Sequence, residues 1–293
     1  MIWLVGDKGM LGTELGEVFA SRGLAFVGSD REVDILDPAA LAAFAEGKGI
    51  RWIVNCAAYT AVDKAEDEEA FALRLNAEGP ENLARLCAAI GARLIHISTD
   101  YVFDGRGSRP YLEADATAPG GAYGRTKAEG ERRVLLAAPD SVILRTAWLY
   151  GRHGPNFVAT MLRLMASRDE IGVVADQKGT PTWAYDLSIA IADIAERPDF
   201  PAGIYHYTDS GETTWHEFAL EIQRTGTELG ILSRPCRVNA LGTEQYPTKA
   251  KRPAYSVLSK EKILSEGLIA PDWRASLRRY LSEASSVPGV VLY

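Results

Sequence analysis

Apolar runs and helical segments alternate along the first half of the chain. Short runs rich in valine, isoleucine and leucine, each bounded by glycine or polar residues, predict strands at residues 2–5, 25–28, 51–56, 93–98 and 141–146. Between these runs, apolar residues recur at helical spacing at residues 10–20, 38–46, 77–90 and 123–136. Apolar strands that alternate with helices are typical of a parallel sheet covered by helices on both faces. The first half therefore predicts a doubly wound α/β domain.

The pattern loosens after about residue 150. Stretches that contain proline and glycine separate the remaining helical segments, which fall at residues 156–167, 183–196, 214–225 and 273–284. This half predicts a smaller lobe at residues 151–293. A strand at residues 203–207 is the candidate for a segment that returns to the first sheet.

Composition and charge narrow the class of protein. The 293 residues are 47% hydrophobic and 24% charged, as in an average globular protein, and the length suggests about two domains. The 32 basic and 39 acidic residues give a net charge of −7, which argues against a nucleic-acid partner.

The three cysteines and four histidines show no disulfide or metal-ligand spacing, so we expect no metal site and a reducing compartment. No apolar run reaches the roughly 18 residues of a membrane span, and we expect a soluble, cytoplasmic protein with no membrane partner.

Three evenly spaced glycines follow the first predicted strand. Gly6, Gly9 and Gly12 lie in the turn that opens the first helix. Glycine permits a tight turn and a close approach of the backbone to a pyrophosphate, while the helix N-terminus offers free N–H groups to phosphate. An ordinary strand-to-helix turn also uses glycine, but the position after the first strand favours a nucleotide.

Residues after the second strand suit the adenosine half of a dinucleotide cofactor. The Asp30 carboxylate can accept hydrogen bonds from the ribose of NAD, whereas the neighbouring Arg31 can pair with the 2′-phosphate of NADP. The preference between NADH and NADPH stays open at this point. Asp34 and Ile35 are candidates to line the adenine pocket, although a solvated Asp34 in an acidic turn is an alternative.

A threonine, a tyrosine and a lysine supply the candidate chemistry. Thr99 follows the fourth predicted strand, and Tyr123 and Lys127 begin the next helix, where positions four apart share a face. A free tyrosine has a pKa of about 10, and a nearby cation favours the phenolate and lowers that pKa. Tyr123 is therefore a candidate general acid or base, with Thr99 orienting the same substrate oxygen. The alternative is an ordinary surface pair of side chains.

These features, in this order along the chain, resemble the extended short-chain dehydrogenase/reductases. More narrowly, the chain resembles the dTDP-4-dehydrorhamnose reductase family, and the segments that carry the likeness are residues 55–66, 98–105, 145–150, 156–157, 176–182, 213–216 and 252–253. The likeness therefore covers nearly the whole chain.

The resemblance implies a Rossmann-type sheet that binds NADPH or NADH at residues 1–150 and a smaller C-terminal substrate-binding lobe at residues 151–293. It implies reduction of dTDP-4-dehydro-β-L-rhamnose to dTDP-β-L-rhamnose, the last step in making a precursor of cell-surface polysaccharides. A homodimer is a further possibility that it raises.

The same resemblance assigns roles to individual residues. The catalytic set is Thr99, Tyr123 and Lys127. The residues placed against the sugar nucleotide are Thr99, Asp100, Tyr123 and Trp148. Those placed against the cofactor are Gly6, Gly9, Met10, Leu11, Gly12, Asp30, Asp34, Ile35, Ala57, Ala58, Tyr59, Tyr123 and Lys127.

Two further residues receive roles by analogy. Asn76 is expected to help hold the active-site helix. Some relatives form dimers around Mg²⁺ held by glutamates, and Glu14 stands on the first helix where one such glutamate lies. The tail at residues 287–293 has no acidic residue, so the sequence does not support this metal site.

Two other functions are compatible with the same resemblance. A sugar-nucleotide epimerase or dehydratase uses the same tyrosine and lysine but retains its NAD unconsumed. A non-catalytic subunit, similar to the regulatory subunit of methionine adenosyltransferase, would bind an enzyme partner and show no turnover. The second half of the chain favours the reductase.

Overall fold

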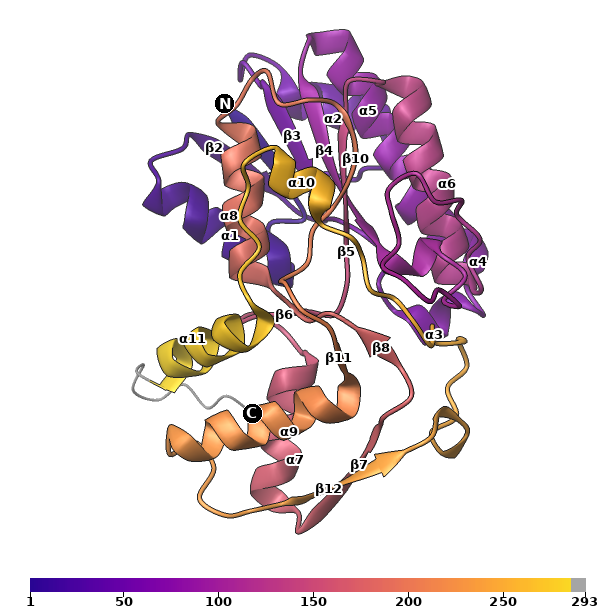
Figure 1. Ribbon diagram of the computed structural model, residues 1–293. Coiled ribbons are helices and arrows are strands. Elements are labelled where there is room, and N and C mark those ends of the chain that lie inside the picture. Colours follow the sequence, from indigo (N-terminus) through magenta and orange to yellow (C-terminus); the bar gives the residue numbers. More distant parts are fainter. Residues whose placement is uncertain (286–293) are drawn as a thin grey trace.

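A six-stranded sheet forms the centre of the molecule (Figure 1). The computed structural model describes residues 1–285 of the chain. All neighbouring strands of this sheet are parallel. In spatial order they are β10 (Gly203–His206), β5 (Val142–Thr146), β4 (Arg93–Thr99), β3 (Trp52–Asn55), β1 (Ile2–Val5) and β2 (Phe26–Ser29).

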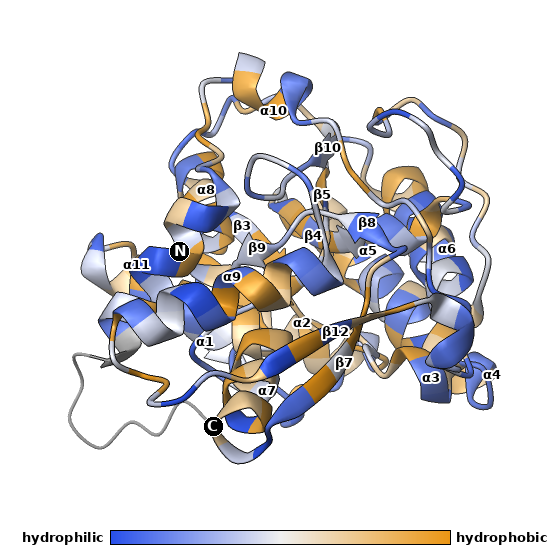
Figure 2. Cartoon of the chain, turned by 60° about the horizontal axis from the view of Figure 1, so that its bottom comes forward, coloured by the Kyte–Doolittle hydropathy of each residue, from blue (hydrophilic) through white to orange (hydrophobic). Residues whose placement is uncertain are grey.

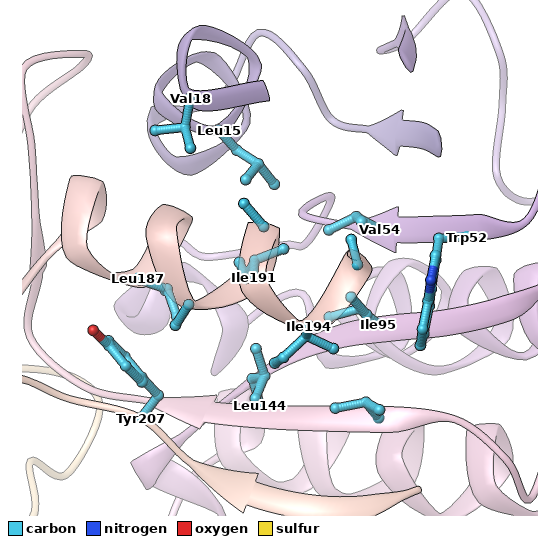
Figure 3. Packing of buried hydrophobic residues seen from close by; sticks show 14 of the residues in the cluster. Leu15, Val18, Trp52, Val54, Ile95, Leu144, Leu187, Ile191, Ile194 and Tyr207 are labelled. Carbon is cyan, nitrogen blue, oxygen red and sulfur yellow. The ribbon is translucent and has the colours of Figure 1, made fainter. Parts of the chain in front are cut away.

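Helices cover both faces of this sheet, which confirms the doubly wound α/β fold. On one face lie α1 (Met10–Ser21) and α8 (Ala184–Ala195), whose apolar residues pack together on the strands. Figure 3 shows this layer, with Ile191 of α8 lying between Leu15 of α1 and Ile95 of β4. The helices that pack on the other face are α2 (Pro38–Ala45), α5 (Gly79–Ile90) and α6 (Ala122–Ala137).

The strand order reverses at β1, and this reversal positions the ligand site. The chain adds β2 on one side of β1 and β3 on the other, with Val5 opposite Asn55 at the carboxyl ends. In open α/β sheets, ligands bind at the carboxyl ends of the strands where the order reverses. The turns after β1 and β3 therefore border the expected cofactor crevice.

The second half of the chain returns to the first sheet, as the sequence predicts. The last strand, β10, pairs in parallel with β5, and Gly203 lies opposite Val142. Helix α8 and Ile263 of α10 (Glu261–Ser265) belong to the same buried cluster as α1. The assignment of residues 151–293 to substrate binding stays a prediction.

The remainder of the second half forms a lobe with its own apolar core. Its helices are α7 (Phe157–Ser167), α9 (Trp215–Glu228) and α11 (Trp273–Ser285). Its short strands form the pairs β7 (Glu170–Val174) with β12 (Arg237–Leu241), β6 (Leu149–Tyr150) with β9 (Thr182–Trp183), and β8 (Lys178–Gly179) with β11 (Thr213–Thr214). In Figure 2, β7 and β12 lie side by side and carry mixed colours, because each strand contains both hydrophilic and hydrophobic residues.

Several short elements were not expected from the sequence. Helices α3 (Val62–Ala65) and α4 (Glu69–Leu73) lead into a π-helical segment, η1 (Arg74–Glu78), where the sequence predicted the start of α5. Two short 3₁₀ turns, η2 (Asp100–Val102) and η3 (Thr243–Gln245), complete the described elements. Within the described part of the chain, no helix is both long and apolar enough to span a membrane.

Candidate active site

The glycine turn is shaped by close backbone contacts. Gly6 has a φ of +77°, and a Cβ there would lie 2.8 Å from the amide nitrogen of Ala57. A Cβ on Gly12 would lie 2.0 Å from the Gly6 carbonyl oxygen. Gly6 therefore lies against the loop after β3, and the first turn of α1 lies against the Gly6 carbonyl. Because the first N–H groups of a helix have no partner within it, the backbone of Met10 and Leu11 suits a diphosphate.

The predicted adenosine residues differ in their surroundings. Asp30 is partly exposed beside the end of β2, and its backbone N–H donates to Glu32 at 2.9 Å. Asp34 is exposed and accepts a hydrogen bond from the Leu36 N–H at 2.9 Å. The Ile35 side chain is buried in the core under α5. Contact of these three residues with adenosine stays a prediction.

Asn76 ties the loop after β3 to the active-site helix. Its side-chain oxygen accepts from the Tyr59 N–H at 2.8 Å, and its Nδ2 donates both to the Tyr59 carbonyl and to Thr126 Oγ1, each at 3.1 Å. Asn76 is fully buried in η1, and Thr126 lies on α6 between Tyr123 and Lys127. The position fits the holding role that the resemblance implies. In the same loop, the Ala57 N–H donates to the side chain of Asn55, at the end of β3.

The structure brings the Thr99 and Tyr123 hydroxyls together. Thr99 ends β4 and Tyr123 lies in the first turn of α6. Burial raises the pKa of Tyr123 well above its usual value, while a hydrogen bond with Thr99 opposes that shift and the nearby Asp100 adds to it. The Tyr101 ring packs edge-on against Tyr123, with 5.5 Å between ring centroids. Tyr123 therefore keeps its proton at neutral pH, as a proton donor requires.

Lys127 does not act on Tyr123 as the sequence suggested. Its side chain is almost fully buried, and its Nζ donates to the Ile97 carbonyl of β4 at 2.6 Å and lies 3.5 Å from His96 Nε2. Burial lowers the pKa of Lys127 to about 8, and the Glu131 carboxylate opposes that shift. The expected fall in the tyrosine pKa is therefore wrong for this structure, because the ammonium is directed to the strand and burial dominates at the phenol.

Asp100 is a second buried ionisable group at the end of β4. It is 3% exposed and accepts a hydrogen bond from Thr99 Oγ1 at 2.9 Å. Burial raises its pKa to about 6, although its hydrogen bonds favour the carboxylate. The Asp100 carboxylate therefore fixes the direction of the Thr99 hydroxyl beside Tyr123.

Trp148 lies where the sheet meets the second lobe. Its backbone has a φ of +48°, the left-handed region that a large side chain rarely adopts. Its ring stacks on Trp215 at the start of α9, with centroids 3.5 Å apart and planes 11° from parallel. A Cβ on Gly179 would lie 2.5 Å from the Trp148 ring and 2.8 Å from Ser256 Oγ. Sequence reasoning missed Ser256, and it included Gly179 and Trp215 only within motifs.

A segment of the second half also reaches the active-site loops. Arg252 donates to the Tyr101 hydroxyl at 3.1 Å and to the Asp63 carboxylate at 2.6 Å. The Ala250 N–H donates to the same carboxylate at 3.0 Å. Arg252 belongs to the short motif at residues 252–253, but its partners were not predictable from spacing. These contacts join the lobe segment to α3 and η2.

Glu14 of α1, the candidate metal ligand, is paired with an arginine side chain. Glu14 is fully buried and is held by Arg152, whose Nε donates to it at 3.1 Å. His153 Nε2 lies 3.9 Å from the same carboxylate. Among residues 1–285, no group of three or more histidine, cysteine, aspartate or glutamate side chains is placed to hold a metal ion. The tail at residues 287–293, on which the sequence argument also depended, lies outside the described residues.

The parallel sheet, the glycine turn and the Thr99, Tyr123 and Lys127 set define an extended short-chain dehydrogenase/reductase. The chain matches the family described as RmlD substrate binding domain over residues 1–286, and it belongs to that family.

Three known proteins show how close the likeness is. The dTDP-4-dehydrorhamnose reductase of Streptomyces griseus is 47% identical over 282 residues, which cover 94% of this chain and 91% of that protein. The crystal structure of the reductase of that name from Clostridium acetobutylicum is 39% identical, with a TM-score of 0.90 over 97% of this chain and 99% of that one. The structure of the Bacillus anthracis reductase in complex with NADP is 35% identical, with a TM-score of 0.90 over 96% and 98% of the two chains.

Proposed function

We propose that the protein reduces dTDP-4-dehydro-β-L-rhamnose to dTDP-β-L-rhamnose with NADPH or NADH. The observation that carries the proposal is the Thr99–Tyr123 pair beside Lys127 at the carboxyl end of β4. Relatives named dTDP-4-dehydrorhamnose reductase, which align over nearly the whole chain, support this substrate.

The reaction is a hydride transfer coupled to a proton transfer. Bound NAD(P)H supplies the hydride. Tyr123 holds the proton that the new alkoxide at C4 of the sugar takes up, and burial keeps that proton in place until then. Thr99, whose hydroxyl donates to Asp100, lies beside the phenol and helps to position it. Proton donation by a positioned side chain contributes about 10²–10⁴-fold to the rate.

The remaining site residues bind the two ligands in this proposal. The N–H groups of residues 10–12 would receive the cofactor diphosphate, and residues 57–59 would border its ribose. Lys127 supplies positive charge beside the nicotinamide ribose. Trp148, supported by the stacked Trp215 ring, forms a wall for the sugar. The Bacillus anthracis relative was solved with NADP, which supports this half of the site.

A homodimer and a cytoplasmic location are further parts of the proposal. The cysteines of the described chain, Cys56, Cys87 and Cys236, are free thiols, which suits a reducing compartment. Light scattering of the purified protein would give the mass of the assembly, and a mass near 31.9 kDa would reject the dimer.

The test is a coupled assay in which the 4-keto sugar nucleotide is made in situ and NADH is compared with NADPH. We expect one NAD(P)H consumed per dTDP-L-rhamnose formed. Tyr123→Phe should lower turnover at least about 100-fold and leave cofactor binding intact, whereas Tyr246→Phe, at an exposed position, should be neutral. A retained, unconsumed cofactor would instead support the epimerase, and no turnover beside a stable enzyme partner would support the regulatory subunit.

A further inference from the structure

Buried polar side chains form a layer behind the active site, on the face of the sheet that α6 covers. His96 and Ser98 of β4, Arg145 of β5 and His206 of β10 are each at most 2% exposed. Ser98 lies opposite Arg145, which lies opposite His206. Towards the amino ends of these strands the same face is apolar. Buried polar groups cost free energy unless they are paired, so their gathering at the active-site end needs an explanation.

Glu131 of α6 is the centre of this layer. This residue is 4% exposed. Arg145 donates two hydrogen bonds to the carboxylate, from Nε at 2.9 Å and from Nη2 at 2.7 Å. Ser98 Oγ donates to it at 2.5 Å, and His206 Nε2 lies 3.4 Å from the far side of the guanidinium. A bidentate arginine and a hydroxyl together fix both the position and the negative charge of the carboxylate.

The carboxylate shares a helix face with Lys127, which lies one turn earlier. The groups that face Lys127 are Glu131 on α6, His96 and the Ile97 carbonyl on β4, and Cys56 after β3. Burial and the lysine charge drive the pKa of His96 well below its usual value, so the imidazole is neutral. Burial raises the pKa of Cys56 to about 12, so the thiol keeps its proton. Glu131 is therefore the anion in this set.

We propose that Glu131, fixed by Arg145 and Ser98, is a positioning residue that keeps the buried Lys127 ammonium charged during reduction. The inference rests on the proposed function and adds a residue to it. Burial favours neutral lysine and holds the pKa of Lys127 near 8 even with Glu131 opposing it. Without the carboxylate that pKa falls further, and a growing fraction of Lys127 is neutral at the pH where the enzyme must work.

Glu131→Gln removes the charge and keeps the shape. We expect the alkaline limb of the kcat profile to move down by about one pH unit, which is roughly a fivefold loss of kcat at pH 8 and a smaller loss at pH 6.5. The KM for the sugar nucleotide should change little, and Glu131→Asp should recover part of the shift. Glu129→Gln, on the same helix but paired with the more exposed Arg132 and Arg133, should keep the wild-type profile.

Arg145 would be left as an unpaired buried cation in Glu131→Gln, and this can destabilise the fold. The double variant Glu131→Leu with Arg145→Leu removes both charges and leaves neither unpaired. If the ion pair only anchors α6 on the sheet, the folded double variant will keep the wild-type pH profile, and the proposal is overturned. A shifted alkaline limb in that variant supports it.

Direct titration of Lys127 separates this inference from the proposed function. Lysine labelled with ¹³C at Cε reports protonation by NMR without turnover, and Lys127→Arg assigns the resonance. We expect a midpoint near 8 in the wild type and a lower midpoint in Glu131→Gln. An unchanged midpoint overturns the role of Glu131. A lowered midpoint in a protein that does not reduce the keto sugar overturns the proposed reaction and leaves that electrostatic role standing.

Discussion

Burial controls the protonation of the side chains at the end of β4. The spacing of Tyr123 and Lys127 predicted that they share a helix face, but it carried no information on depth. In the structure, burial raises the pKa of the tyrosine and lowers that of the lysine. Both shifts come from lost solvation, which depends on the strands and loops around the residues. The sequence therefore predicted the residues and misjudged the electrostatics.

The free energy of unfolding of the variant Asp100→Asn tests whether burial raises the pKa of Asp100. The folded pKa of Asp100, about 6, lies above its usual 3.8, so the folded state binds the proton more tightly than the unfolded state. Stability from this group is present below about pH 4 and is lost as the pH rises towards 6. At pH 7 we therefore expect Asp100→Asn to raise the free energy of unfolding by up to about 3 kcal/mol, measured by urea denaturation.

The gain should disappear near pH 4, where the wild-type carboxyl is protonated in the fold. Asp115 is the matched control, because Arg109 and a backbone N–H lower its pKa to about 2. Asp115→Asn should change stability in the opposite direction above pH 4. An Asp100→Asn variant that is less stable than the wild type at pH 7 and unaffected by pH would contradict the burial argument.

At the scale of elements, the contact between α6 and η1 fixes the active-site helix. A Cβ on Gly130 would lie 2.0 Å from the Asn76 carbonyl oxygen. Alanine normally favours a helix over glycine by about 1 kcal/mol, but the close approach reverses that preference here. We expect Gly130→Ala to destabilise the fold by about 1–3 kcal/mol and to lower kcat, because α6 and η1 must separate.

Thermal unfolding and steady-state kinetics check this prediction. Gly120→Ala is the control, since nothing lies within 4 Å of a Cβ at that position. A Gly130→Ala variant as stable and active as the wild type would show that the contact between α6 and η1 does not hold the site.

Long periodic elements were predictable and short ones were not. The strands of the central sheet lie within one residue of their predicted ends, because buried parallel strands read as continuous apolar runs. The two-residue strands of the lobe, such as β8, are too short to show an alternation of apolar and polar residues. Segment η1 shares its pattern with an ordinary helix, so its π-helical geometry depends on packing against α6.

For the whole molecule, the site is assembled from distant parts of the chain. Gly6 meets Ala57 across the strand-order reversal, Trp148 meets Trp215 between sheet and lobe, and Arg252 reaches back towards η2. Motif order indicated that these segments belong to one family. The particular contacts depend on how the lobe folds back, which spacing along one sequence does not encode.

A ligand that binds this assembled crevice must stabilise the whole fold. At about 100 times its dissociation constant, NADPH or NADH should add about 2.7 kcal/mol to the free energy of unfolding, which raises Tm by several degrees. Gly12→Ala should lose this shift, because its Cβ would lie 2.0 Å from the Gly6 oxygen. Gly16→Ala, on the same helix with its nearest contact at 3.6 Å, should retain it. Equal shifts in both variants would contradict the placement of the cofactor at this turn.

The most direct test of the central claim is to follow the hydride itself. The 4-keto sugar nucleotide is reduced with NADPH or NADH that carries deuterium at C4 of the nicotinamide, and the product is analysed by mass spectrometry and NMR. The account predicts one deuterium per product, at C4 of the rhamnose, with one cofactor oxidised. A product without deuterium, formed while the cofactor remains unconsumed, would contradict it.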